Sequence, residues 1–387
     1  MNILFYHKNG IYPTSGGISK ITCNLTSLFR DKGHNVFYLA NRPIKDKNYV
    51  YDEEQFFLPN EHLDAPENYL FIENLIKSNK IQYIINQCPF DTGFLEVISR
   101  YKSKYNFKII SCYHNSIITP IRNYAFQKEW FWKKWKKLLF LLLKQYAIQN
   151  ILVNSYILRN RNKYKKTYEL SDSVIVLCGG LKKELLKMIG LRDSSKIDII
   201  PNFNSTNLQY DRRKDNEVLW IGTTEFQTKR LDFMLDVWCI VYKNNPGWTL
   251  KVLGDGPSLT MAKELVKKEH IANVSFEGRV DPTKYLESAK IICVTSSHES
   301  FSLVTIEGLA SGVYPVIINS FPAASMLIKN QENGSLVKAF SRAEFAKELN
   351  RVMNSPLPSP ESLAASVEKY SPEQAYQNWM ALFDSLK

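Results

Sequence analysis

The sequence predicts an α/β protein made of two doubly wound, Rossmann-like domains that face each other across a cleft. Three observations predict this. The chain has 387 residues, more than one ordinary core accommodates. Short apolar strands alternate with amphipathic helices in both halves, and glycines follow the first strand of each half. A composition of 44% hydrophobic and 23% charged residues is typical of globular domains.

The N-terminal half opens with a strand, a glycine loop, a helix and a second strand. The strand 2–7 leads through Gly16 and Gly17 into a helix with apolar residues at helical spacing. Glycines at such a junction let the backbone approach an anion, although an ordinary tight turn is the alternative. Further strands are expected at 35–40, 81–86, 108–114, 174–178 and 196–202.

The second half repeats the alternation after a polar, irregular stretch at 204–217, which we interpret as the inter-domain linker. We therefore expect an N-terminal domain at 1–203 and a C-terminal domain at 204–370. A last helix, 371–387, is expected to pack back on the N-terminal domain. Strands of the second half are expected at 217–222, 249–253, 273–278, 291–297 and 314–319.

The chain is basic, with a formal net charge of +12, which suits nucleic acid, acidic lipid headgroups or anionic small molecules. Its six cysteines are scattered and form no CxxC pair, so neither a zinc site nor a disulfide framework is indicated. The N-terminus lacks signal-peptide anatomy. We expect a cytoplasmic protein, or one peripheral on the inner face of the plasma membrane.

The segment HESFSLVTIEGLASGVYPVI, residues 298–317, places two carboxylates around one apolar helix. Glu299 precedes the helix, and Glu307 lies roughly 7 Å further along its axis. The helix start offers unpaired N–H groups to an anion, and carboxylates accept hydrogen bonds from hydroxyls. A diphosphate there would have one carboxylate for a sugar and one for a ribose. The alternative is a capping residue plus a solvated helix face.

This segment resembles the nucleotide-sugar motif of the retaining GT-B glycosyltransferases of family four. The family pattern has Glu, seven residues, Glu and a small-residue turn before Pro-Val-Val. The resemblance spans nearly the whole chain and is weakest from about 115 to 170. Other marks in the same order are Gly16-Gly17, a strand ending at His114, IIPN (199–202), WIG…KR (220–230), LGDGP (253–257) and FEGRV (276–280).

The resemblance implies roles for individual residues. Glu299, which would contact the donor sugar, and His114, near the transferred sugar, would be catalytic. Glu307 would hold the ribose and Lys229 the diphosphate. The other substrate-binding residues that it implies are Gly16, Gly17, Gly222, Arg230, Val280, Phe301, Ser302 and Leu303. The alternatives are a surface pair for Lys229 and Arg230 and an ordinary core or loop histidine for His114.

Four positions depart from the family pattern. Thr223 stands where arginine is usual, and Arg230, in place of a common glycine, is expected to supply that cation. Ser302 replaces a glycine and would crowd the sugar pocket. Gly308 replaces an alanine.

No Asp-x-Asp triplet occurs in the sequence, which argues against a metal-held diphosphate. Lysine, arginine and a helix N-terminus can neutralise a leaving group without a cation. We expect transfer without metal or cofactor. The resemblance implies retention at the anomeric carbon.

The segment 126–146 interleaves tryptophans and leucines with lysines. Basic amphipathic helices of this kind suit anionic membrane surfaces, and a packed helix with solvated lysines is the alternative. The apolar run within it is too short to span a bilayer.

We therefore predict a retaining hexosyltransferase that moves a hexose from a nucleotide-sugar donor, most simply a UDP-sugar. The expected acceptor is a glycan or a lipid-linked glycan of the cell envelope, bound by the N-terminal domain, with no nucleic-acid partner. The alternatives are a nucleotide-sugar epimerase of the same fold, or a non-catalytic basic protein that binds nucleic acid or a sugar nucleotide.

Overall fold

The computed structural model describes residues 1–13, 16–44, 54–132, 137–205, 214–338 and 340–387. It separates into two compact units. The first contains residues 1–115, 157–202 and 372–387, and the second contains residues 116–156 and 203–371. The sequence-based boundary is corrected for residues 116–156, which fold with the second unit although they lie within the N-terminal half of the chain. Most of the expected linker, 206–213, lies outside the described residues.

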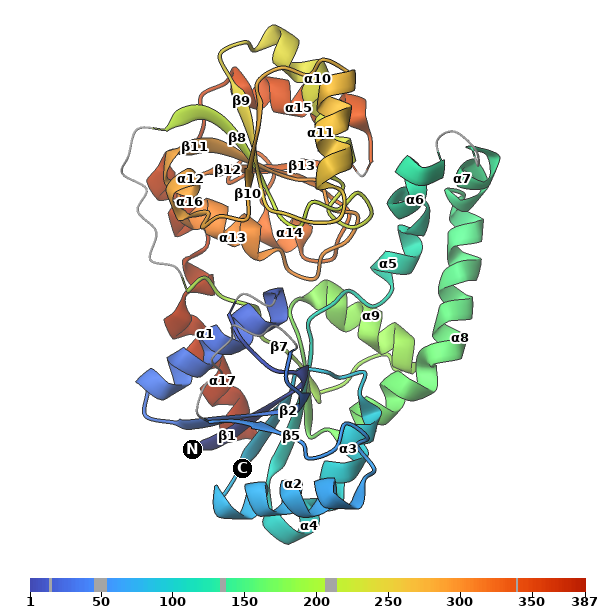
Figure 1. Ribbon diagram of the computed structural model, residues 1–387, viewed down its shortest axis with the longest axis vertical. Coiled ribbons are helices and arrows are strands. Elements are labelled where there is room, and N and C mark those ends of the chain that lie inside the picture. Colours follow the sequence, from blue (N-terminus) through green and yellow to red (C-terminus); the bar gives the residue numbers. More distant parts are fainter. Residues whose placement is uncertain (14–15, 45–53, 133–136, 206–213, 339) are drawn as a thin grey trace. The chain divides into compact units, whose positions relative to one another are not determined.

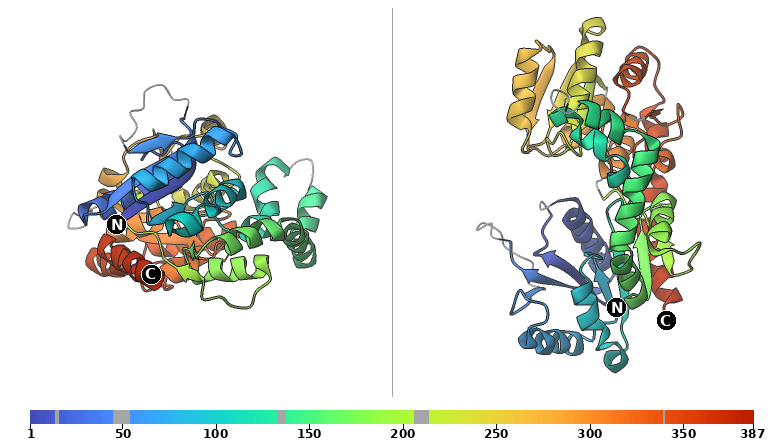
Figure 2. Two further views of the ribbon diagram at one scale, coloured as in Figure 1. Left: turned by 90° about the horizontal axis from the view of Figure 1, so that it is seen from below. Right: turned by 90° about the vertical axis from the view of Figure 1, so that its right-hand side faces the viewer.

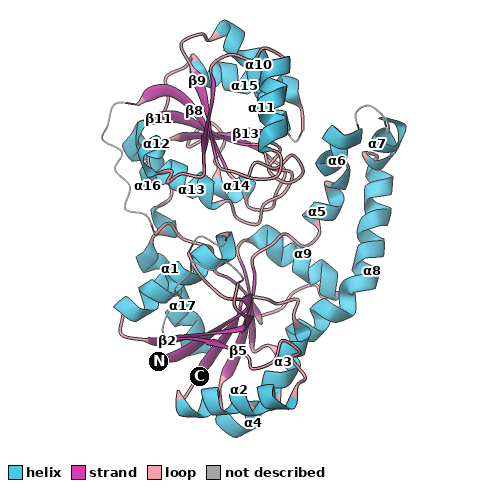
Figure 3. Ribbon diagram, viewed as in Figure 1, coloured by secondary structure: helices cyan, strands magenta, loops and turns pink. Residues whose placement is uncertain are grey.

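The first unit is built on a parallel sheet in the order β3-β2-β1-β4-β5-β6-β7, with helices on both faces (Figures 1 and 3). Strand β1 is apolar and fully buried from Ile3 to Tyr6 because neighbouring strands flank it and helices cover it. Its strands are β1 (Asn2–Asn9), β2 (Asn35–Arg42), β3 (Gln55–Phe57), β4 (Tyr83–Asn86), β5 (Lys108–Tyr113), β6 (Ser173–Val176) and β7 (Ile197–Ile199).

Amphipathic helices cover this sheet. Helix α1 buries Ile21, Leu25 and Phe29 on one face, and α9 ends at Gly190, whose positive φ of 82° suits a helix stop. The helices are α1 (Gly17–Asp31), α2 (Pro66–Ser78), α3 (Thr92–Ser99), α4 (Lys102–Tyr105), α9 (Gly179–Ile189) and α17 (Pro372–Ser385). Helix α8 (Tyr146–Leu170) runs from residues of the second unit into residues of the first.

The C-terminal helix α17 belongs to the first unit, so both chain termini lie there (Figure 2). Trp379 and Phe383 pack on Phe29 of α1, with ring centroids 6.0 Å apart in both pairs. The hydroxyl of Tyr83 donates to the carbonyl of Phe383 (3.1 Å). These contacts link the last helix to both a helix and a strand of the first unit.

The second unit contains a parallel sheet in the order β10-β9-β8-β11-β12-β13. Strand β12 is buried along its whole length and consists mainly of β-branched and aromatic residues. The strands are β8 (Asp215–Ile221), β9 (Thr249–Leu253), β10 (Val274–Gly278), β11 (Ala289–Val294), β12 (Tyr314–Ile318) and β13 (Ser335–Val337).

Helices of the second unit include three from the N-terminal half of the chain, α5 (Thr119–Arg122), α6 (Tyr124–Trp132) and α7 (Lys137–Leu143). No helix in the described part of the chain is long and apolar enough to cross a membrane. The remaining helices are α10 (Leu231–Val241), α11 (Leu259–Lys268), α12 (Thr283–Ser288), α13 (Leu303–Ala310), α14 (Ala324–Leu327), α15 (Arg342–Met353) and α16 (Pro360–Ala365), with short 3-10 turns at Tyr242–Asn244 and Glu368–Tyr370.

Candidate functional site

The strand order of the second sheet changes direction between β8 and β11, which are neighbours although they are far apart in the sequence. In open α/β sheets, ligands bind beyond the carboxyl ends of the strands at such a switch point. The loop 222–230 follows β8, and the loop 295–302 follows β11. These two loops carry most of the residues that the sequence predicted for the second domain.

Lys229 and Glu299 meet at this point. The ammonium Nζ of Lys229 donates to Oε1 of Glu299 (2.5 Å), and their side chains are 28% and 15% exposed. Ser296 Oγ donates to the same carboxylate oxygen (2.8 Å). The structure thus brings together a cation and a carboxylate that lie seventy positions apart in the sequence, with part of each accessible to a ligand.

Glycines allow the loops of this site to approach one another. A Cβ on Gly222 would lie 3.6 Å from the side chain of Lys229, so the lysine stem extends across that glycine. A Cβ on Gly254, which follows β9, would lie 1.9 Å from the carbonyl oxygen of Gly222. Only glycine fits at 254, and the backbone there fixes the position of the loop that carries Lys229.

The Glu299 loop is held by hydrogen bonds from two directions. Thr295 Oγ1 donates to the carbonyl of Lys229 (3.0 Å), and the amide of Ser297 donates to the carbonyl of Thr228 (2.7 Å). From the other direction, Asn123 Nδ2 donates to the carbonyl of Ser297 (2.6 Å), and Ser116 Oγ donates to the carbonyl of Glu299. The segment around α5 therefore contributes directly to the placement of this loop.

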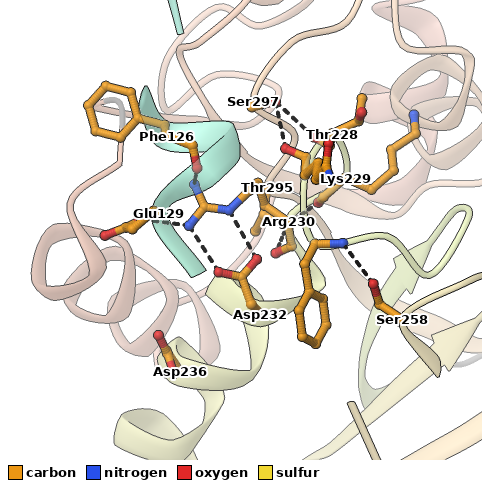
Figure 4. A network of polar contacts seen from close by, with 12 residues as sticks. Phe126, Glu129, Thr228, Lys229, Arg230, Asp232, Asp236, Ser258, Thr295 and Ser297 are labelled. Carbon is orange, nitrogen blue, oxygen red and sulfur yellow. Dashed lines mark hydrogen bonds and ion pairs between the residues drawn. The ribbon is translucent and has the colours of Figure 1, made fainter. Parts of the chain in front are cut away.

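Arg230 does not contribute a cation to this site, and the prediction that it binds substrate is wrong. Its side chain is fully buried and points away from Lys229, its neighbour in the sequence (Figure 4). Two of its nitrogens donate to the two carboxylate oxygens of Asp232, each at 3.0 Å. It also donates to Oε2 of Glu129 (2.6 Å) and to the carbonyl of Phe126 (2.8 Å), both in α6. The guanidinium therefore joins α6 to the start of α10.

Glu129 links this arginine to a second one. Its Oε1 accepts from Arg342 (3.0 Å), which in turn donates to Asp236 (2.6 Å). Burial favours the neutral form of Glu129, but the two guanidinium groups outweigh it and hold the pKa of this carboxyl below its usual range. Aromatic contacts lie beside these charged groups. The rings of Phe126 and Phe340 stack with centroids 3.8 Å apart, and the rings of Trp130 and Phe226 pack with centroids 4.9 Å apart. Helix α6 is therefore a packed helix, as the alternative interpretation of 126–146 expected for this part.

Helix α13 starts at Leu303, directly after the Glu299 loop. Ser302 has the left-handed conformation, with φ of 67°, which explains why the resembling family usually has glycine at this position. Its hydroxyl lies 2.8 Å from that of Thr305, so it is engaged within the helix turn. Phe301 is buried and packs edge-on against Tyr370 (5.3 Å), and Glu307 is buried within the helix.

Gly308 and Thr223 are the two remaining positions that depart from the family pattern. A Cβ on Gly308 would lie 3.0 Å from Ile292 on β11, so the alanine of the family pattern would be tight here. Thr223 is exposed. Val280, 39% exposed, lies just after β10, at the same edge of the sheet as the two loops.

The remaining predicted residues lie in the first unit. His114 follows β5 and lines a pocket of about 550 Å³ together with Lys8, Gln87 and Asp91. Ile18, in the first turn of α1 next to Gly16 and Gly17, lines the same pocket, so these glycines and His114 share one region. A Cβ on either glycine would meet nothing within 4 Å, so the space beside the two glycines is open to a ligand.

His114 is held as a neutral side chain. Its Nε2 is hydrogen-bonded to Oε1 of Gln87, which follows the adjacent strand β4. Burial, with a smaller effect of nearby His7, lowers its pKa to about 4. A neutral imidazole can accept or donate one hydrogen bond but carries no charge toward a ligand.

Ser116, Asn123 and Glu129 support the site and were not predicted from the sequence. One signal was available for Glu129, since it is the only acidic residue between Glu96 and Glu169. A lone carboxylate in a long basic stretch suggests a specific cationic partner.

Two family matches cover most of the chain. The family described as Glycosyl transferases group 1 matches residues 209–373, and the family described as Glycosyltransferase Family 4 matches residues 15–207. The pneumococcal O-GlcNAc transferase GtfA, solved with UDP and GlcNAc, has a similar fold. That likeness has a TM-score of 0.73 at 11% identity and covers 100% of this chain and 99% of the other.

Two relatives show the extent of sequence similarity. An uncharacterised glycosyltransferase of Haemophilus influenzae is 32% identical over 162 residues, 41% of this chain and 46% of its own length. The poly(ribitol-phosphate) alpha-N-acetylglucosaminyltransferase of Staphylococcus aureus is 24% identical over 236 residues, 59% of this chain and 46% of its own length. The chain thus spans about half the length of these relatives.

Proposed function

Since this chain belongs to the GT-B glycosyltransferases of family four, we propose that it transfers a hexose from a UDP-sugar to a glycan or lipid-linked acceptor of the cell envelope. The observation that carries the proposal is the pair of Lys229 and Glu299 at the switch point of the second sheet. A cation beside a partly exposed carboxylate matches the two chemical parts of a sugar nucleotide, a diphosphate and a hydroxyl-rich ring.

In this proposal each side chain has one task. The ammonium of Lys229 pairs with the diphosphate and stabilises the charge that develops on it as the glycosidic bond breaks. Glu299 then accepts hydrogen bonds from hydroxyls of the sugar and orients it. The start of α13 faces the phosphates with its first N–H groups, and Glu307 accepts from the ribose.

The pocket around His114 is proposed to bind the acceptor. It lies at the carboxyl ends of β4 and β5, where the first sheet also changes direction between β1 and β4. A neutral His114 can hydrogen-bond a sugar hydroxyl without attracting water as an imidazolium would.

The choice of UDP and of an envelope acceptor is supported by the relatives. GtfA was solved with UDP and GlcNAc, and the Staphylococcus aureus relative is named for transfer to poly(ribitol-phosphate). Retention at the anomeric carbon and transfer without metal remain proposals, which an NMR analysis of product configuration and an assay with and without EDTA would test.

The first experiment measures UDP binding by calorimetry and sugar transfer against a panel of UDP-, GDP- and ADP-sugars. Glu299→Ala should keep UDP binding but lower the transfer rate about a hundredfold or more, because it removes a contact to the sugar. Glu307→Ala and Lys229→Ala should each weaken UDP binding roughly tenfold to a hundredfold, the range for a lost charge-assisted hydrogen bond. Glu332→Ala, at a carboxylate whose side chain is 72% exposed, is the control.

Several outcomes would contradict the proposal. Normal transfer by both glutamate variants would place the site elsewhere. Conversion of the UDP-sugar to its epimer without acceptor would favour an epimerase. Binding of oligonucleotide but of no sugar nucleotide would favour a nucleic-acid-binding protein.

A further inference from the structure

Helix α7 presents an unusual row of exposed leucines. Leu138, Leu139, Leu141 and Leu142 are 73%, 39%, 46% and 50% exposed, and Tyr146 at the start of α8 is 76% exposed. Single exposed leucines are normal on protein surfaces, but a contiguous cluster marks an interaction surface. We call these five residues the α7 surface.

The helix is anchored so that this surface faces outward. Phe140 packs edge-on against Phe126 of α6 (6.2 Å), and Phe126 stacks on Phe340. Lys144 lies over the rings of Phe126 (5.3 Å) and Phe140 (5.0 Å). One side of α7 is therefore fixed to the second unit through aromatic contacts, while its leucines remain exposed.

The sequence around this surface is strongly basic. Between Trp130 and Tyr146 the sequence has five lysines and no aspartate or glutamate. These are Lys133, Lys134, Lys136, Lys137 and Lys144. A second group of cations, at 159–166, follows on α8 within the first unit, where Lys166 pairs with Glu96.

We propose that the α7 surface inserts into the headgroup region of an anionic lipid bilayer. Exposed leucines in a lysine-rich stretch of the sequence match the two parts of such a membrane, since the leucines enter the acyl boundary while the lysines pair with anionic headgroups. The expected membrane-binding segment was 126–146, but Phe126 and Trp130 of α6 are engaged in packing. Membrane contact is therefore assigned to the α7 surface, within 138–146.

Charge decides between a membrane and other occupants. A second copy of this chain would bring the same five lysines against these, and like charges oppose such an interface. Nucleic acid would suit the charge, but single strands are bound by stacking of bases on aromatic rings, whereas this surface is mainly leucine.

The test is sedimentation of the full chain with vesicles of phosphatidylcholine, alone or with about one-third phosphatidylglycerol, at low and high salt. Leu138→Glu/Leu142→Glu removes two apolar contacts and adds two negative charges. The matched control is Leu70→Glu/Ile240→Glu, which makes the same changes at residues 63% and 51% exposed on α2 and α10. Melting temperature and UDP binding are measured for every variant, so that a folding defect or a failure of the proposed transfer is recognised separately.

We expect the wild type and the control to sediment with anionic vesicles at low salt, with salt weakening the binding. The α7 variant should bind about tenfold or more weakly. Absence of wild-type binding to anionic vesicles, or equal binding by the α7 variant, would overturn the proposal. So would light scattering that shows a wild-type dimer without lipid and a monomeric α7 variant, since the surface would then be a self-association interface.

Discussion

Replacement of Arg230 by methionine tests whether this arginine is structural or binds a ligand. The change removes the guanidinium while keeping a chain of similar length. Asp232, whose side chain is fully buried, would lose both hydrogen bonds to Arg230, and its next cation, Arg342, lies 3.8 Å away. Removing one partner of a buried ion pair costs about 3–5 kcal/mol, since the other charge remains buried and uncompensated.

The magnitude can be converted to a melting temperature. For a unit of this size, that of residues 116–156 and 203–371, each kcal/mol shifts the midpoint by about 2–4 °C. We therefore expect Arg230→Met to lower the melting temperature by roughly 6–20 °C, measured by calorimetry or circular dichroism. Arg351→Met is the control, because that side chain is 43% exposed and such pairs contribute about 0–1 kcal/mol.

A double variant separates lost packing from uncompensated charge. Asp232→Asn added to Arg230→Met neutralises the buried carboxylate and should recover part of the stability, with a coupling of about 1 kcal/mol or more. Unchanged melting of Arg230→Met together with a tenfold weaker UDP affinity would refute the reasoning, because it would show that the arginine binds the ligand.

The carboxyl of Glu129 gives a pH test of the same cluster. Its pKa is lowered on folding, so its stabilisation is present above the unfolded pKa and is lost as pH falls through the folded one.

Two further predictions concern Gly254 and His114. Gly254→Ala should cost about 3 kcal/mol or more, because its Cβ would lie 1.9 Å from the carbonyl oxygen of Gly222, whereas Gly247→Ala, with nothing within 4 Å, should change denaturant stability by less than about 0.5 kcal/mol. Equal effects of the two alanines would contradict the close approach of the loops. NMR titration of His114 should show a neutral imidazole down to about pH 4. Because the unfolded chain takes up this proton from about pH 6.5 downward, the folded state should lose stability between those values, and titration near pH 6.5 in the native protein would refute the burial.

The strand and helix pattern was predictable from the sequence because it depends on local periodicity. Every strand expected from an apolar run is present, including β7, whose three residues lie within the expected strand 196–202. Strands β3 and β13, also of three residues, were missed because each is too short to show a period and no longer apolar run surrounds it. The approach of Glu299 to Lys229 was predictable only through the family resemblance, since it joins distant loops.

Two errors have one physical cause. The sequence shows Arg230 next to Lys229, but not that Asp232 and Glu129 surround it, so a buried cation was taken for a ligand contact. The domain boundary failed for the same reason, because the assignment of residues 116–156 depends on tertiary contacts of α6 with the second unit. Local patterns report propensity, and these contacts are set by packing between segments a hundred residues apart.

The chain passes from one unit to the other at 115/116, 156/157, 202/203 and 371/372. A fragment cut at the apparent boundary, residues 203–371, would therefore lack Glu129, Phe126 and Asn123, and would present the buried Arg230 and Phe226 to water. The second unit is discontinuous in the sequence, and a graft that keeps the loops 222–230 and 295–302 in place must carry residues 116–132 together with 203–371.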